Sequence, residues 1–323
     1  MADVVAFGEL LVDFVPAAGP QSLVTAEIFK KAAGGAPANV AAGLARLGIS
    51  SAFMGMVGED EFGRFLAGEL WKASVDVAPL RFTAKARTGL AFVSLQANGD
   101  RDFLFYRSPG ADMLMTPEDV DSGALRAAKA FHFGSISLAS EPSRASTLHA
   151  AGLAREYGKL VTYDPNLRLE LWPSADDARA GMRLGLAQAE VVKISEEELH
   201  FLTDEPDPIA GARRLWSPRL RLMTVTRGAA GCSWLTPDAD GEVAGFPVNA
   251  IDATGAGDAF MAGLIAGILA SSAVLTDPAH ISEACRFANA VGALATTGRG
   301  AIPSMPTRQE VEDLLRLHAR ITA

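Results

Sequence analysis

Residues 252–270 read DATGAGDAFMAGLIAGILA, a glycine-rich turn followed by a long apolar run. Gly255 and Gly257 let the backbone pass close to a ligand, and the run after them predicts a helix that begins near Ala256. The first N–H groups of a helix lack partners inside it and carry the positive end of its dipole, so this turn can bind an anion. Asp258 falls in the first helical turn, where a carboxylate would repel such an anion. Its position is explained if it accepts a proton from an attacking hydroxyl, although helix starts also favour aspartate by themselves.

A second glycine pair precedes a helical pattern near the N-terminus, where residues 34–39 read GGAPAN. Gly34 and Gly35 permit close backbone approach, and Pro37 suits the first turn of the helix that follows. The amide of Asn39 can both donate to and accept from hydroxyl groups. Taken alone, this segment could equally be an ordinary junction between a loop and a helix.

Strand and helix patterns alternate along the rest of the chain. The expected strands are Asp3–Gly8, Ser51–Val57, Ala130–Phe133, Leu160–Asp164, Val191–Ile194 and Leu222–Thr226, with a late antiparallel hairpin over Gly231–Leu235 and Gly241–Val248. The expected helices include Phe62–Ala73, Glu141–Tyr157, Ala256–Leu275, Ile281–Thr296 and Arg308–Ile321. This order predicts an α/β protein whose mainly parallel sheet is covered by helices on both faces. No internal repeat or linker divides residues 1–323, so we expect one main domain.

Two β-rich patches, at about residues 10–33 and 88–112, stand outside that alternation. The second contains Asn98-Gly99-Asp100, a typical hairpin turn. We expect the two patches to form a small sheet of their own.

Composition excludes several classes of function. The formal net charge of −9 and the absence of basic runs disfavour nucleic acid and anionic membranes as partners. The N-terminus does not resemble a signal peptide, and the longest apolar run is too rich in small residues for a membrane span. Two isolated cysteines and five scattered histidines predict a reducing compartment, the cytoplasm, and no zinc site.

The usual phosphate-binding motifs are missing as well. The chain has neither the GxxxxGK[ST] loop of Walker-type nucleotide sites nor a GxGxxG motif after its first strand. The anion site in residues 252–258 therefore needs another explanation. Together with residues 34–39 it resembles the paired signature motifs of the pfkB carbohydrate kinases, in the same order and covering essentially the whole chain. That resemblance implies a ribokinase-like fold, a Rossmann-like αβα sandwich with the small sheet as a lid.

The resemblance also implies roles for the first motif. Gly255, Ala256 and Gly257 would form the anion hole for the transferred phosphate, and Asp258 would deprotonate the sugar hydroxyl. Most members carry Thr or Ser where this chain has Ala253. That side chain is not expected to be catalytic.

The resemblance to the pfkB family also implies which residues bind ATP and its metal ions. Residues 195–198 resemble the NxxE motif tied to Mg-ATP, with Glu198 acting on Mg²⁺ indirectly and Ser195 in place of the usual Asn. ATP would also be bound by Thr226, Gly228, Gly231 and Asn289. Asp252 and the loop 297–300 resemble the segments that bind a monovalent cation such as K⁺ in some members.

Other segments resemble fructokinases more than ribokinases or adenosine kinases. They are residues 8–14, 105–112 and 164–172. Asp13 would accept hydrogen bonds from two sugar hydroxyls, beside Gly34, Gly35 and Asn39. Asn166, Arg168 and Arg107 are further candidate contacts to the substrate or its phosphate.

The expected activity is the phosphorylation of a sugar by ATP with Mg²⁺, converting fructose to fructose 6-phosphate. 2-Keto-3-deoxygluconate or another sugar is the alternative substrate. A different alternative is a family member that has lost catalysis and serves as a binding or regulatory subunit, against which the intact Asp258 and its glycines argue. The resemblance also suggests a homodimer formed through the lid.

Overall fold

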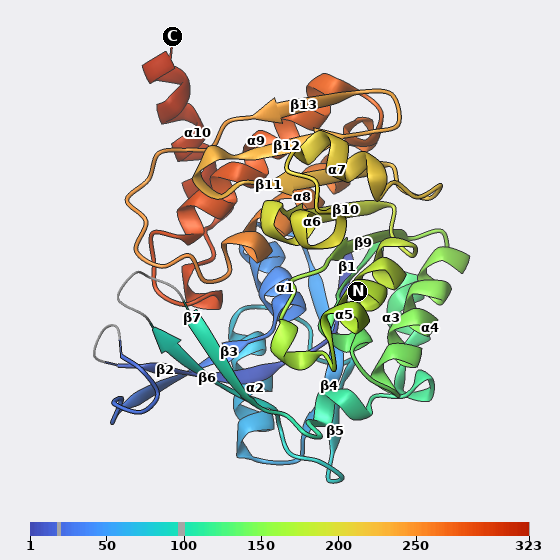
Figure 1. Ribbon diagram of the computed structural model, residues 1–323, viewed down its shortest axis with the longest axis vertical. Helices are drawn as coiled ribbons and strands as arrows, with labels where there is room; N and C mark the ends of the chain where they lie inside the picture. The colour runs from blue at the N-terminus through green and yellow to red at the C-terminus, as the bar shows by residue number, and fades with distance from the viewer. Residues whose placement is uncertain (18–20, 96–100, 323) are drawn as a thin grey trace.

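The computed structural model describes residues 1–17, 21–95 and 101–322, and a large sheet runs through its centre (Figure 1). Its strands lie in the order β13 (Asp240–Val243), β12 (Cys232–Leu235), β11 (Leu222–Thr226), β10 (Val191–Ser195), β9 (Leu160–Asp164), β8 (Ala130–Gly134), β1 (Val4–Phe7), β4 (Ser51–Gly58) and β5 (Leu80–Thr83). Neighbours from β11 to β5 are parallel. β12 and β13 are antiparallel, as the sequence predicted.

Helices cover both faces of this sheet because its strands are apolar on both sides. One face carries α1 (Ala36–Arg46), α8 (Ala256–Ala270), α9 (Pro278–Ala295) and α10 (Arg308–Thr322), and the other carries α3 (Ser122–Ala127), α4 (Ser143–Glu156), α5 (Ala175–Leu186), α6 (Glu196–Thr203) and α7 (Pro208–Arg214). Side chains alternate between the two layers along each strand. On β10, Val191 packs against α8 and α9, whereas Val192 and Ile194 pack on the opposite side.

A smaller sheet lies beside the main one and forms the lower left of Figure 1. Its strands have the order β3 (Phe29–Gly34), β2 (Leu11–Pro16), β6 (Leu90–Leu95) and β7 (Arg101–Tyr106). They come from the two β-rich patches that the sequence set apart, and the predicted turn Asn98-Gly99-Asp100 lies outside the described residues. α2 (Glu61–Lys72) packs between β2 and β4. β3 leads directly into α1, so the small sheet meets the main body at Gly34 and Gly35.

Three local predictions differ from the structure. The second arm of the late hairpin, predicted over Gly241–Val248, ends at Val243, because Gly245 and Pro247 disfavour a strand. The helix predicted over Ala256–Leu275 ends at Ala270, because Ser271 is extended and its hydroxyl caps the 3₁₀ turn η6 (Ser272–Leu275). β5 was not predicted, since its four residues include Arg81 and Thr83 and give little apolar signal. The remaining 3₁₀ turns are η1 (Ala111–Leu114), η2 (Pro117–Asp119), η3 (Ile136–Leu138), η4 (Leu169–Leu171), η5 (Gly228–Ala230) and η7 (Ile302–Ser304).

Candidate active site

Asp258 lies in the first turn of α8 and is 6% exposed. Gly255 precedes the helix with a left-handed φ of 76°, and a Cβ there would come within 2.7 Å of the Ala301 Cβ, so glycine is required at this position. The Nδ2 of Asn39, 219 residues away in α1, donates to Asp258 Oδ2 at 2.8 Å. The fold therefore joins the two glycine motifs of the sequence at one carboxylate.

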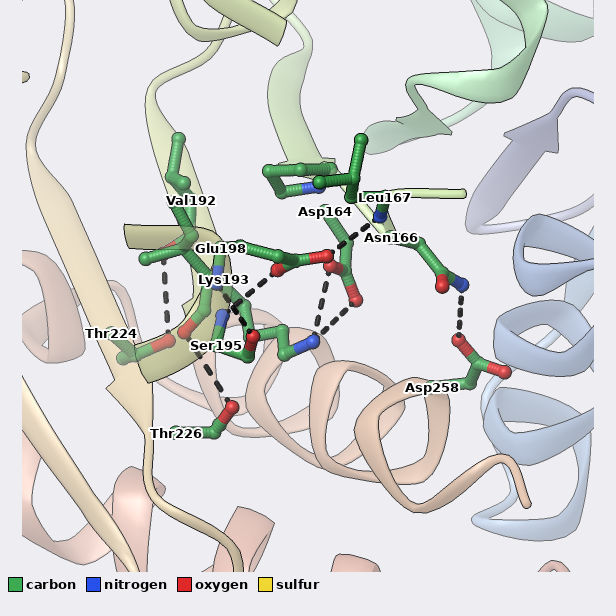
Figure 2. A network of polar contacts seen from close by, with 12 residues as sticks. Asp164, Asn166, Leu167, Val192, Lys193, Ser195, Glu198, Thr224, Thr226 and Asp258 are labelled. Atoms are coloured by element: carbon green, nitrogen blue, oxygen red, sulfur yellow. Dashed lines mark hydrogen bonds and ion pairs between the residues drawn. The ribbon is translucent and has the colours of Figure 1, made fainter. Parts of the chain in front are cut away.

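The loop after β9 approaches Asp258 from the other side (Figure 2). Asn166, held at φ 45°, places its Nδ2 at 3.5 Å from Asp258 Oδ1. The neighbouring Leu167 N–H donates to Glu198 Oε1 at 2.7 Å, and the Ser195 N–H donates to Glu198 Oε2 at 2.9 Å. Glu198 thus ties the start of α6 to the loop that carries Asn166.

The environment of Asp258 sets its proton affinity. Burial raises the pKa of its carboxyl group above the ordinary aspartate value, and Glu198 adds to that rise. The hydrogen bond from Asn39 and the positive charges of Lys193 and Arg168 oppose it. A carboxylate whose pKa is raised, flanked by amides that hold its two oxygens, is suited to accept a proton from a hydroxyl group.

A buried ion pair lies under this turn and was not predicted. Lys193 Nζ, on β10, is 3.1 Å from both carboxylate oxygens of Asp164, which ends β9. Burial raises the pKa of Asp164 to about 7, while the charge of Lys193 lowers it. A lysine inside the apolar strand VVKIS was the available signal, because buried lysines are rare unless they are paired.

Asp13 lies in the small sheet, on β2, opposite Ala32 of β3 and Ala91 of β6. Its carboxylate lies over the backbone of Gly34, where any side chain would collide with it. Gly35 follows as the residue that caps α1. The structure therefore groups Asp13, Gly34 and Gly35 at the junction with the main body, and Asn39 follows the two glycines in the first turn of α1.

The two candidate arginines have partners within the protein. Arg107 is 5% exposed, and its Nε and Nη2 lie 2.7 and 2.5 Å from Asp112 Oδ2. Arg168 donates to the Leu167 carbonyl at 2.8 Å, and its guanidinium lies 5.3 Å from the centre of the Phe103 ring in β7. Arg168 thereby connects the loop after β9 to the small sheet.

Glu9 is a buried acid that the sequence did not single out. It is 2% exposed, and its Oε1 accepts the Ala36 N–H at 2.9 Å, which anchors the start of α1. Burial raises the pKa of Glu9 to about 7, although the charge of Arg107 lowers it. In the sequence Glu9 simply follows the first strand, and nothing there indicates that it holds the start of a helix 27 residues later.

The candidate nucleotide-binding residues lie together where β10 and β11 end, at the carboxyl edge of the large sheet. Ser195 and Thr226 are direct neighbours in the β10–β11 register, and Thr226 pairs with Cys232, next to Gly231. Gly228 begins η5, the turn that connects Thr226 to Gly231. Asn289 of α9 donates its Nδ2 to the carbonyls of Val243 and Ala244 at 3.1 and 3.2 Å, which holds the backbone after β13 against this edge.

Asp252 joins two loops through its carboxylate. Its Oδ1 accepts the Thr254 N–H at 2.8 Å and its Oδ2 accepts the Gly300 N–H at 2.9 Å. Across residues 1–17, 21–95 and 101–322, no group of three or more His, Cys, Asp or Glu side chains could hold a metal ion. Within the same ranges no helix is both long and apolar enough to cross a membrane.

Comparison with known proteins adds a family and several close relatives. The model of the pfkB family of carbohydrate kinases matches residues 1–308. A probable chloroplastic fructokinase-6 of Arabidopsis thaliana is 50% identical, over 97% of this chain and 82% of its own length. The structure of fructokinase from Xylella fastidiosa with bound ATP is 37% identical, covers 99% of this chain and all of that one, and superimposes with a TM-score of 0.90. Fructokinase from Vibrio cholerae with fructose, ADP and calcium is 38% identical, covers 98% and 99% of the two chains, and gives a TM-score of 0.89.

Proposed function

This chain belongs to the pfkB family of carbohydrate kinases, and we propose that it transfers the terminal phosphoryl group of ATP to the 6-hydroxyl of fructose. The observation that carries the proposal is the buried Asp258, held by Asn39 and Asn166 in the first turn of α8. Relatives that are about half identical over nearly the whole chain are named fructokinases, and one similar fructokinase structure contains fructose and ADP.

Phosphoryl transfer depends mainly on positioning and on stabilising charge. The backbone of the turn that begins α8, at Gly255, Ala256 and Gly257, would receive the transferred phosphoryl group. Asp258 would take the proton of the sugar hydroxyl as its oxygen forms a bond to phosphorus and the bond to ADP breaks. The intact carboxylate and turn argue against a catalytically inactive binding subunit.

The sugar would lie between the small sheet and the main body. Asp13, Gly34, Gly35, Asn39, Asn166, Arg168 and Arg107 are the proposed contacts. Asp13 would accept from two hydroxyls, and the small sheet, with strands drawn from about 10–33 and 88–112 of a single domain, would close as a lid. 2-Keto-3-deoxygluconate is the weaker candidate, because the relatives that are about half identical over nearly the whole chain are named fructokinases.

ATP would bind along the edge formed by Ser195, Thr226, Gly228, Gly231 and Asn289. The residues present fit Mg²⁺ carried by the nucleotide, since Mg²⁺ usually keeps several waters and binds few carboxylates. Both oxygens of Glu198 accept backbone N–H groups, so Glu198 would act on the metal through water and through the position of Ser195. The bound Mg²⁺ would neutralise phosphate charge. A K⁺ ion beside Asp252 stays a prediction, as does the cytoplasmic location.

A coupled assay of ADP release tests the substrate. Fructose, ribose, 2-keto-3-deoxygluconate and adenosine would be compared at one concentration of ATP and Mg²⁺. We expect the highest kcat/KM with fructose. A higher value with 2-keto-3-deoxygluconate would replace the proposed substrate, and no ADP release with any of them would support the binding subunit.

Glu198→Gln should raise the Mg²⁺ concentration needed for half-maximal rate. The amide replaces one acceptor oxygen with an NH₂ group, which would face either the Leu167 or the Ser195 N–H. The measurement is the rate against Mg²⁺ at saturating ATP and sugar. Glu197→Gln, one residue earlier on α6, is the matched control. An unchanged Mg²⁺ dependence would restrict Glu198 to capping its helix.

The face of the small sheet opposite to Asp13 is the proposed surface of a homodimer through the lid; α2 covers part of it, since Phe62 packs edge-on to Phe14. Phe14 stacks on Phe92 at 4.9 Å between ring centres, and Tyr106 packs edge-on to Phe92 at 5.5 Å while remaining 62% exposed. Leu104, on the same face, is 48% exposed. Analytical ultracentrifugation should give a mass twice that of the 33.8 kDa chain for the wild type, and the mass of a single chain for Leu104→Asp. A monomeric wild type would contradict this.

A further inference from the structure

The ammonium group of Lys193 is buried beneath the turn that begins α8. The side chain is 7% exposed and leaves β10 on the same side as Val191, which packs against α8 and α9. The register that pairs Val192 with Tyr163 puts Lys193 beside Asp164, and Nζ lies 3.1 Å from both of its carboxylate oxygens. Figure 2 shows this ammonium on the side of β10 that faces Asp164 and Asp258.

Lys193 also contacts the glycine turn itself. A Cβ built on Gly257 would lie 3.0 Å from Lys193 Nζ and 3.7 Å from its Cε. The backbone of the turn therefore passes directly over the ammonium, and a side chain at position 257 would displace it. Lys193 adds a full positive charge to a helix N-terminus that carries only the partial charge of its dipole.

Negative charges outnumber positive ones around this group. Asp164, Glu198 and Asp258 all raise the pKa of Lys193 and outweigh the effect of its burial, so the ammonium stays protonated. Asp258 is faced by Asn39 from α1, Asn166 and Arg168 from the loop after β9, Lys193 from β10 and Glu198 from α6. Of these, Lys193 and Arg168 are the cations that offset its burial.

We propose that Lys193 is a positioning residue for phosphoryl transfer: its buried ammonium, held by Asp164, supports the Gly257 turn and supplies a positive charge beneath the turn that carries Asp258. This role rests on the proposed function. Lys193 keeps its own proton throughout, while Asp258 gains the hydroxyl proton as the new oxygen–phosphorus bond forms.

Replacing Lys193 separates its charge from its bulk. Lys193→Met removes the charge and keeps the length, and it should lower kcat by about ten- to a hundred-fold with KM values for ATP and sugar changed by less than about three-fold. The acid limb of the kcat profile should move to higher pH, because the Asp258 base then loses its negative charge at a higher pH. Lys193→Arg keeps the charge and should retain the wild-type limb and most of the activity.

Variants of Asp164, the partner of Lys193, separate a loss of catalysis from a loss of folding. Asp164→Asn leaves the ammonium without its anion, so the acid limb should move the opposite way, to lower pH. The double variant Lys193→Met with Asp164→Asn leaves no unpaired buried charge and should fold even where a single variant does not. It should still show the lowered kcat. Because the two changes shift the acid limb in opposite directions, the deciding measurement is kcat: wild-type kcat in a folded double variant would reduce the pair to a structural one and overturn the proposal.

Measuring the pKa of Asp258 in the absence of substrate tests the role of Lys193 independently of which sugar is phosphorylated. In protein labelled with ¹³C at the aspartate carboxyl carbons, the Asp258 signal is identified by its loss in Asp258→Asn. Its pKa should rise in Lys193→Met and stay near the wild-type value in Lys193→Arg. Equal pKa values in wild type and Lys193→Met would overturn the role of Lys193, whether or not fructose is the substrate.

Discussion

Asp258→Asn should lower kcat by about 10²–10⁴ while the KM values for sugar and ATP stay near those of the wild type. The amide keeps the shape of the side chain and an oxygen that can accept the 2.8 Å hydrogen bond from Asn39. It cannot take a proton from the attacking hydroxyl. The measurement is steady-state ADP release at saturating ATP and Mg²⁺, and a variant that kept more than about a tenth of wild-type kcat would remove Asp258 from the role of general base.

Stability and pH give two checks on that result. Because burial raises the pKa of Asp258, its ionised form costs stability above that pKa, and the asparagine variant should be at least as stable at neutral pH. Thermal unfolding therefore separates lost chemistry from lost folding. In the wild type kcat should fall as the pH drops through the raised pKa, since only the ionised carboxylate accepts a proton. The residual rate of Asp258→Asn should lack this limb.

Asp13→Ala should lower kcat/KM for fructose by about ten- to several hundred-fold, with little change in the affinity for ATP. Hydrogen bonds to a charged carboxylate are stronger than neutral ones, and leaving a buried partner unpaired costs about 1–3 kcal/mol per group. Asp13 lies on the small sheet, over Gly34, whereas Ser195 and Thr226 end strands of the large sheet, so the effect should be confined to the sugar.

A substrate-by-mutant cycle makes this prediction specific. With the wild type, removing a contacted hydroxyl from fructose should lower kcat/KM about as much as Asp13→Ala does. With Asp13→Ala, the same removal should lower kcat/KM much less, at fixed ATP and Mg²⁺. Asp76→Ala, an exposed aspartate outside the site, serves as the control. If each deoxy analogue carries the same penalty in both enzymes, Asp13 does not touch the sugar.

Local patterns were enough to predict most elements of the fold. The alternation of strands and helices predicted the parallel sheet, and the bounds of β9 and β11 agree with the structure to the residue. Asp258 could be proposed as a base because its turn is a local feature: two glycines, a helix start and a carboxylate within seven residues. Such signals are readable because backbone hydrogen bonding and apolar periodicity depend on neighbours in the chain.

The partners of these residues depended on the tertiary structure. Asn39 and Asp258 are 219 residues apart, and the Lys193–Asp164 pair forms only because β9 and β10 lie side by side in the sheet. The sequence by itself determined the family, the order of elements and the turn that carries Asp258. Only the packed structure decided which charges are buried together, because desolvation and Coulomb interaction depend on distance in space rather than along the chain. Those charges set the proton affinity of Asp258, and their arrangement revealed Lys193 beneath it.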